Sequence, residues 1–265
     1  MKKIFKYLAI IVLVLALDKA LWALINGSFY ERLMGLWEDE NFPRIIGSLA
    51  EILIFGSLYY KLLGKDLNIS KIRTMSPLWI VVIGLGVSGM SIIWMSLYDA
   101  LSPPVLTASG QDLGLTVGSS FIPSLIFAGI LGPIAEELIF RGILFSSLKR
   151  TGLGAGLAIV LSGLIFGLWH GNFVQAVYAS LGGMVFAYVF YKTDSLGLVI
   201  LIHIINNSLS SIIGDLGPDF IQEAYSYIAM LMVPVLFYKL YKMKNLGENN
   251  ENTTDDSGPG PSRGL

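Results

Sequence analysis

The sequence contains no cysteine and little charge. Only 14% of its 265 residues are Asp, Glu, Lys or Arg, whereas a soluble domain carries about 25%. The lack of cysteine excludes disulfides, thiolate metal sites and a cysteine nucleophile. A net charge of −1 argues against a nucleic-acid partner. Hydrophobic residues make up 54% of the chain and the mean hydropathy is +0.67, so the composition predicts a protein embedded in the lipid bilayer.

Eight apolar segments indicate an all-α polytopic membrane protein with about eight transmembrane helices, because about 20 apolar residues cross a bilayer as a helix. The first segment follows a basic N-terminus and resembles a signal peptide, but no small-x-small cleavage site follows it, so we expect a retained helix. Residues 1–246 are predicted to form one transmembrane domain, and the polar tail 247–265 is predicted to be disordered. The predicted helices cover residues 4–25, 44–63, 77–98, 121–148, 153–171, 173–191, 196–213 and 220–242.

Lysine and arginine concentrate at one set of helix ends, here called the basic ends. The opposite loops are acidic and hold only Arg32 and Arg44. Since basic loops stay on the cytoplasmic side, we expect an integral protein of a bacterial cytoplasmic membrane with both termini in the cytoplasm. The basic ends contain Lys2, Lys3, Lys6, Lys61, Lys65, Lys71, Arg73, Lys149, Arg150, Lys192, Lys239, Lys242 and Lys244.

Three charged residues lie inside the fourth apolar segment, where charge is costly and usually functional. Glu137 and Arg141 are four residues apart on one helical face, close enough to pair. Glu136 is rotated by about 100° and is therefore predicted to face elsewhere. A carboxylate held at low dielectric can take a proton from water. The alternative is a structural ion-pair cluster in a transporter core.

The chain has only two histidines, and both lie in apolar segments. His170 ends the fifth segment, whose glycine stripe would let it approach the fourth segment closely. His203 and Asn207 share a face of the seventh segment, where imidazole and amide groups suit an oxyanion site or, for His203, a metal ligand. A satisfied core histidine is the alternative for His170. Asn206 points elsewhere and could equally make an interhelical hydrogen bond.

A separate charged group occurs in the first two segments. Asp18 and Lys19 in the first and Glu51 in the second lie at similar distances from the acidic loop. We predict that Lys19 and Glu51 form an interhelical pair with a structural role. Extension of the Lys19 ammonium to the membrane surface is the alternative.

Three motifs, in this order on apolar segments, resemble those of the CPBP family. This family comprises the CAAX prenyl endopeptidases of the Ras-converting type and the bacteriocin-processing or immunity proteins formerly called Abi. The resemblance covers residues 121–213 and implies an eight-helix intramembrane endopeptidase whose site opens toward the cytoplasm. The motifs are E-E-x-x-x-R at Glu136, Glu137 and Arg141, F-x-x-x-H at Phe166 and His170, and H-x-x-x-N at His203 and Asn207.

The resemblance also implies a role for each motif residue. Glu136 and His170 would activate the attacking water, and His203 with Asn207 would stabilise the oxyanion. The other three motif residues would support the site. The expected substrate is a membrane-associated peptide or protein, either lipidated or carrying a leader peptide.

Other intramembrane proteases fit this sequence less well. The chain has no H-E-x-x-H motif of site-2-type zinc proteases, no G-x-G-D motif of presenilin-type proteases and no G-x-S-x-G elbow. Two other functions stay open: a non-catalytic member of the same fold, acting in bacteriocin immunity or binding a sensor kinase, and a proton-coupled transporter. The intact motifs argue against the first, and the lack of an inverted repeat argues against the second.

The motifs allow hydrolysis with or without a metal ion. Glu136, His170 and His203 could supply three ligands to zinc and leave a fourth position open. Alternatively, Glu136 acts as the base with no metal, and this is the version we favour.

Overall fold

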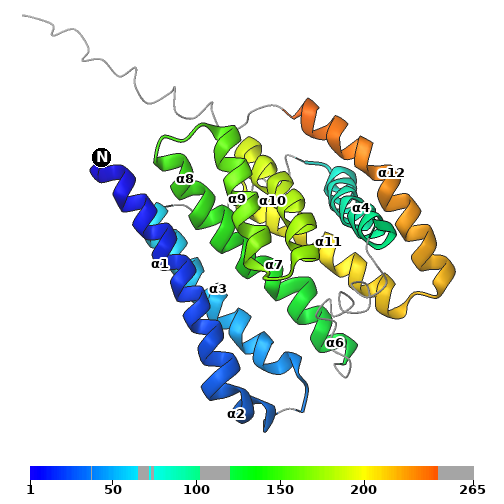
Figure 1. Cartoon of the computed structure of the whole chain (residues 1–265), viewed down its shortest axis with the longest axis horizontal. Coiled ribbons are helices and arrows are strands. Elements are labelled where there is room, and N and C mark those ends of the chain that lie inside the picture. The colour runs from blue at the N-terminus through cyan, green and yellow to red at the C-terminus, as the bar shows by residue number, and fades with distance from the viewer. Residues whose placement is uncertain (37, 65–71, 73–74, 102–119, 244–265) are drawn as a thin grey trace, which may run out of the picture.

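The computed structural model describes residues 1–36, 38–64, 72, 75–101 and 120–243. Within these ranges the chain forms helices and no strand, which confirms an all-α fold (Figure 1). The tail predicted to be disordered lies outside the described residues, as do Lys65, Lys71, Arg73 and Lys244 of the basic ends.

Eight helical segments occur where the sequence predicted them. The first is α1 (Lys2–Leu24), continued by the π-turn η1 (Ile25–Phe29) and α2 (Tyr30–Met34). The fourth is continuous through α6 (Phe121–Ser124), η3 (Leu125–Leu131), α7 (Gly132–Glu137), η4 (Leu138–Phe145) and α8 (Ser146–Arg150). The others are α3 (Asn41–Leu63), α4 (Pro77–Leu101), α9 (Ala155–Trp169), α10 (Phe173–Thr193), α11 (Leu196–Leu216) and α12 (Asp219–Lys242).

Seven of the eight described segments are long and apolar enough to cross a membrane. The eighth, α9, has 15 residues and rises only about 22 Å, less than the hydrocarbon thickness of about 30 Å. The fifth helix is therefore shorter than the predicted segment 153–171. α9 pairs with α10, and after both helices the chain is back at the basic end from which α9 started. The assignment of the loops to the basic and acidic ends is therefore unchanged.

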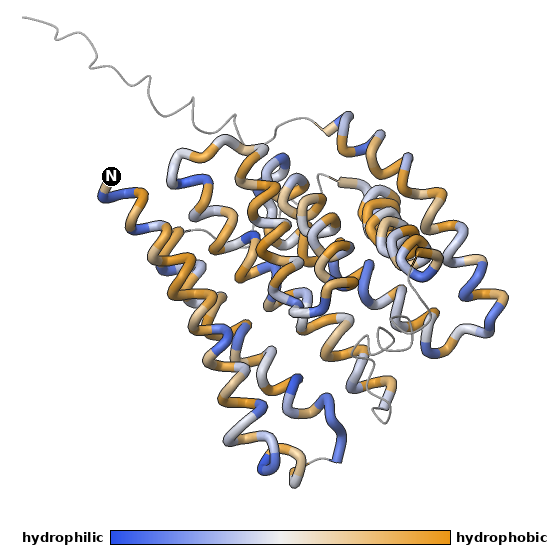
Figure 2. The backbone as a smooth tube through the Cα atoms, in the orientation of Figure 1, coloured by the Kyte–Doolittle hydropathy of each residue, from blue (hydrophilic) through white to orange (hydrophobic). Residues whose placement is uncertain are grey.

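The outer surface of the bundle is apolar, as expected for helices in lipid. Leu13, Leu53, Leu78 and Leu231 are each 66–72% exposed. Figure 2 shows hydrophobic residues along most of each helix and many of the hydrophilic residues near helix ends. Such a continuous apolar surface is rare on a soluble monomer, and this is an integral membrane protein.

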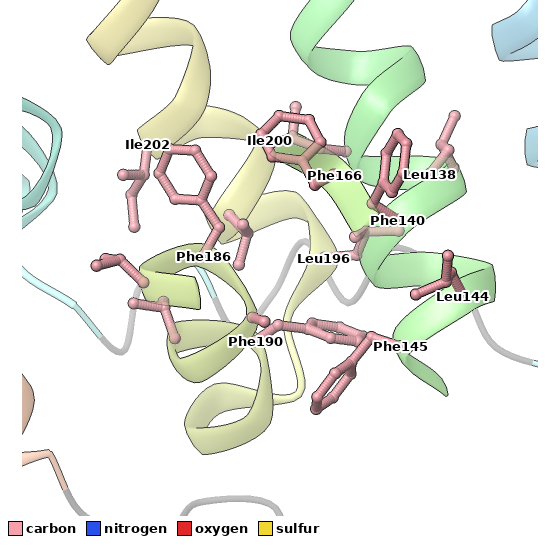
Figure 3. Packing of buried hydrophobic residues seen from close by; sticks show 14 of the residues in the cluster. Leu138, Phe140, Leu144, Phe145, Phe166, Phe186, Phe190, Leu196, Ile200 and Ile202 are labelled. Atoms are coloured by element: carbon pink, nitrogen blue, oxygen red, sulfur yellow. The ribbon is translucent and has the colours of Figure 1, made fainter. Parts of the chain in front are cut away.

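The fourth segment lies at the centre of the bundle. Every residue of η4 is buried, and its aromatic side chains pack against α9, α10 and α11 (Figure 3). The rings of Phe140 and Phe166 meet edge to face with centroids 5.0 Å apart, and those of Phe145 and Phe190 do so at 5.9 Å. This packing fixes the helix that carries the glutamates and the arginine.

The glycine stripe of α9 faces α10 rather than the fourth segment. A Cβ at Gly163 would lie 2.8 Å from the carbonyl oxygen of Ser180, and one at Gly167 would overlap the carbonyl of Ala176. The glycines thus allow close contact within the α9–α10 pair. His170 approaches the fourth segment for a different reason: it directly follows the end of α9, where the chain turns.

The predicted Lys19–Glu51 pair is wrong. Glu51 accepts a hydrogen bond of 2.7 Å from the Trp22 indole, and its carboxyl group interacts with that of Asp18 rather than with Lys19. The Lys19 ammonium lies 3.8 Å from the centroid of the Trp169 ring. The reason is the helical rotation of about 100° per residue, which turns Asp18 toward α3 and leaves Lys19 exposed.

Candidate active site

The charged pair expected in the fourth segment is present and completely buried. Arg141 Nη1 donates to Glu137 Oε1 at 2.9 Å, and both side chains have no exposed surface. Arg141 Nη2 also donates to the carbonyl oxygen of Gly183 on α10 at 3.1 Å. The guanidinium lies 4.4 Å from the ring centroid of Phe166 and 5.3 Å from that of Phe186. Arg141 thus neutralises Glu137 and ties the fourth segment to α10.

Glu137 also holds His203. The Nδ1 atom of His203 lies 2.8 Å from Glu137 Oε1, the oxygen that accepts from Arg141. Because a carboxylate only accepts, Nδ1 of His203 carries the hydrogen. A neutral His203 therefore presents a lone pair at Nε2.

That Nε2 atom faces the second glutamate. It lies 3.7 Å from Glu136 Oε2, so the two adjacent glutamates contact the two nitrogens of one imidazole. The prediction that Glu136 faces away from Glu137 is thus corrected. Their Cα–Cβ bonds diverge, but both long side chains reach around the His203 ring, which α11 places against this edge of α7.

His170 approaches Glu136 from the end of α9. Its Nδ1 atom lies 2.9 Å from the carbonyl oxygen of Phe166, one turn earlier, so this nitrogen also carries a hydrogen. Its Nε2 atom lies 4.0 Å from Glu136 Oε1. The Nε2 atoms of the two imidazoles therefore each approach a different oxygen of one carboxylate.

Phe166 connects the parts of this site. Its ring meets the His170 ring at 4.9 Å and the His203 ring at 6.1 Å, both edge to face, in addition to its contacts with Phe140 and Arg141. The F-x-x-x-H spacing therefore gives His170 two contacts with one residue: the buried ring of Phe166 and its carbonyl oxygen, which orients the imidazole.

Glu136 is the most accessible of the ionisable site groups. Its side chain is 32% exposed, compared with 18% for His170 and 5% for His203. The Nε2 atoms of His170 and His203 both lie beyond direct hydrogen-bond distance of the Glu136 carboxylate. This arrangement leaves the carboxylate free to take a proton from a water molecule beside it.

Asn207 lies one turn beyond His203 and is held by hydrogen bonds. Its Nδ2 donates to the carbonyl oxygen of Ala128 in η3 at 3.0 Å, and its Oδ1 accepts from Asn206 at 2.8 Å. Asn206 in turn accepts from Ser88 on α4 at 2.8 Å, so it makes the expected interhelical bond. The sequence did not predict the roles of Ser88 and of the carbonyl groups of Ala128 and Gly183. A backbone acceptor or a single serine forms no recognisable sequence pattern.

The three residues considered as zinc ligands have suitable donor atoms but not the spacing. Two ligands about 2.05 Å from a tetrahedral ion lie about 3.3 Å apart, whereas the nitrogen-to-oxygen separations here are 3.7 and 4.0 Å. Over the described part of the chain, no group of three or more His, Cys, Asp and Glu side chains has the spacing of a metal site. The side-chain positions therefore do not fit a bound ion.

Comparison with known proteins identifies the same region. Residues 118–209 match the family model of Rce1-like type II CAAX prenyl endopeptidases, and all seven motif residues fall within the match. The predicted resemblance is confirmed. No solved structure matches the chain significantly.

Two curated bacterial proteins are similar to this chain. The "Membrane-embedded CAAX protease MroQ" of Staphylococcus aureus (strain USA300) is 33% identical over 106 residues, which are 38% of this chain and 42% of the relative. The "Putative membrane peptidase YdiL" of Bacillus subtilis (strain 168) is 34% identical over 86 residues, which are 32% of this chain and 34% of the relative. This chain therefore aligns with less than half the length of either protein.

Proposed function

We propose that this protein is an intramembrane endopeptidase acting on a membrane-associated peptide or protein. One observation carries the proposal: the Nε2 atoms of His170 and His203 face the two oxygens of Glu136 at 4.0 and 3.7 Å inside an apolar bundle. Buried polar groups at membrane depth are costly unless they act together. The family match and the names of the two relatives support a peptidase.

Hydrolysis begins at Glu136 in this proposal. Its carboxylate takes a proton from water as the water oxygen attacks the peptide carbonyl carbon. The Nε2 lone pair of His170 accepts a hydrogen bond from the other water hydrogen, which stays on the oxygen, and so orients the nucleophile. When the C–N bond breaks, Glu136 returns its proton to the amine nitrogen. Each catalytic cycle adds the hydroxyl group of the water to the acyl carbon and its other hydrogen to the amine nitrogen.

Asn207 is the proposed donor to the oxyanion. An amide nitrogen carries two hydrogens, so the bond to Ala128 leaves one for the developing charge. Neutral His203 has no hydrogen at Nε2 and stabilises an oxyanion only when protonated. The Glu137 carboxylate accepts from Nδ1 at 2.8 Å and holds the His203 ring beside the reacting atoms.

The activity is tested with purified protein in lipid nanodiscs and a library of lipidated and unlipidated peptides. We expect cleavage of peptides that partition into the membrane, detected by mass spectrometry. The His170→Ala variant is the control, because it removes the orienting lone pair while leaving the Glu137–Arg141 pair intact. Turnover by wild type and variant at equal rates would show that the cleavage comes from a contaminant.

Replacing the oxyanion donor is expected to slow chemistry. Asn207→Ala should lower kcat by about 10²–10³-fold with KM nearly unchanged, as for loss of one oxyanion donor. Steady-state cleavage of a fluorogenic peptide measures both constants. Ser208→Ala is the matched control, since it removes a neighbouring hydrogen bond from α11 to η3, to the Gly129 carbonyl oxygen, and leaves the Asn207 amide in place. Equal losses in the two variants would assign Asn207 a positioning role.

We propose that hydrolysis needs no metal ion. Pure protein should contain no stoichiometric zinc by elemental analysis, and a chelator should leave cleavage unchanged. Activity that is lost to a chelator and regained with zinc would contradict this proposal. Loss of bound zinc in His203→Ala would then assign the three side chains as ligands.

We also propose that both termini are cytoplasmic, from the distribution of the basic ends. A reporter fused after Lys244 should read as cytoplasmic, and one inserted near Asp112 should read as external. Alkaline phosphatase and fluorescent-protein fusions in bacterial cells give the two readings. A C-terminal reporter that reads as external would show that the whole bundle has the opposite orientation in the membrane.

A further inference from the structure

A cavity with polar groups in its wall lies beside Asn207. This cavity of about 380 Å³ opens between α4, α10, α11 and α12, and Asn207 and Ala128 form part of its wall. This volume is at the low end of the range for ligand pockets, about 300–1,000 Å³. Hydroxyl and amide groups dominate the polar part of its lining, and no lining residue is charged. Its polar side chains include Ser88, Ser91, Tyr178, Asn206, Asn207 and Ser210.

The cavity lies toward the end of the bundle opposite the basic ends. Gly214 near the end of α11 and Gln222 and Tyr225 near the start of α12 line it, whereas Lys239 and Lys242 are in the last turn of α12. In Figure 1 the α11–α12 connection lies at the lower right, far from the N-terminus. The resemblance to CAAX endopeptidases implies an opening toward the cytoplasm, and this cavity opens in the other direction.

Hydrogen bonds run without a break from the outer part of the cavity to the site. Each member of this series is an uncharged side chain that can both donate and accept. The series is Tyr225 OH to Ser210 Oγ at 2.9 Å, Ser210 to Ser88 at 3.4 Å, Ser88 to Asn206 at 2.8 Å and Asn206 to Asn207 at 2.8 Å.

The cavity reaches the proposed oxyanion site. Tyr178 on α10 and Asn207 on α11 both form part of its wall. Asn207 belongs to both the cavity wall and the proposed oxyanion site. A small polar molecule in the cavity is therefore near the proposed oxyanion donor.

We propose that this cavity is the water entrance of the hydrolytic site, an inference that rests on the proposed function. Each bond cleaved consumes one water molecule, and the bilayer core provides none. A lining that carries donors and acceptors can hold water, and it offers no charged side chain to an ion. The entrance is separate from the cytoplasmic opening that the family resemblance implies for substrate.

Single cysteines test whether the cavity is wet, because the chain has none of its own. Ser91→Cys places a thiol in the cavity wall, where the serine bonds only the Val87 carbonyl of its own helix. Leu53→Cys, 72% exposed near the middle of α3, faces lipid and is the control. Since only the thiolate reacts and it forms in water, a sulfonated methanethiosulfonate should modify Ser91→Cys at least about tenfold faster in nanodiscs. Equal rates would overturn the proposal.

A second variant blocks the entrance. Gly214 lines the cavity and a Cβ there meets no atom within 4 Å, so Gly214→Leu adds apolar bulk at the cavity wall. It should slow modification of Ser91→Cys and lower kcat, both by about tenfold, with KM kept. Gly156→Leu on α9, where a Cβ also meets nothing within 4 Å, should change neither.

The outcomes separate the two proposals. Labelling needs no catalysis, so a wet cavity in a protein that cleaves no peptide would overturn the endopeptidase function alone. A higher KM with unchanged kcat and unchanged labelling in Gly214→Leu would make the cavity a peptide subsite and overturn the water entrance.

Discussion

Glu136→Gln is expected to lower peptide cleavage by about 10²–10⁴-fold, the usual contribution of a general base. The amide keeps the size of the side chain but cannot accept a proton from water. Since Glu136 is the most exposed ionisable group of the site and lies outside the Glu137–Arg141 pair, the protein should still fold and unfold normally. Initial rates on a fluorogenic peptide, with thermal unfolding of the same sample, measure both properties.

Glu51→Gln is the matched control for that variant. Glu51 is also a buried glutamate in a membrane helix, but its partners are Trp22 and Asp18 rather than the histidines. The amide oxygen of glutamine can still accept the hydrogen bond from the Trp22 indole, so the substitution changes little. We expect activity within a few-fold of wild type. Comparable losses in Glu51→Gln and Glu136→Gln would remove the assignment of Glu136 as the base.

Breaking the buried pair is expected to have the largest effect on stability. Arg141→Met or Glu137→Gln should each cost about 3–5 kcal/mol, because one charge then stays buried without its partner. The double variant should be more stable than the sum of the single changes predicts, since it leaves no isolated charge. Unfolding in mixed micelles with increasing denaturing detergent measures all three free energies.

The same series separates anchoring from chemistry. Glu136→Gln serves as the stability control and should change the unfolding free energy by less than about 1 kcal/mol, as is usual away from buried networks. The single variants of the pair should lose activity in proportion to the folded fraction and to the disorder of His203, which Glu137 holds at 2.8 Å. Strict additivity in the double variant would show that the pair makes no net contribution.

Linear patterns in the sequence determined the elements of this protein. Apolar runs placed all eight helical segments, because burial in lipid depends on composition over about 20 residues and needs no tertiary information. The four-residue spacing of Glu137 and Arg141 determined their pairing, because residues i and i+4 are neighbours on any helix.

Tertiary packing alone decided how these elements meet. The short α9 ends inside the bundle and places His170 beside Glu136, and the α9 glycines serve its contact with α10. Rotation about the helix axis predicted that Glu136 and Glu137 diverge, yet the position of α11 puts His203 between them. The similar depths of Lys19 and Glu51 in the membrane predicted that they pair. The rotation of α1 about its own axis instead turns Asp18 toward Glu51. Sequence spacing specifies neighbours along one helix, whereas relative rotation and approach of helices depend on side chains from every segment packing at once.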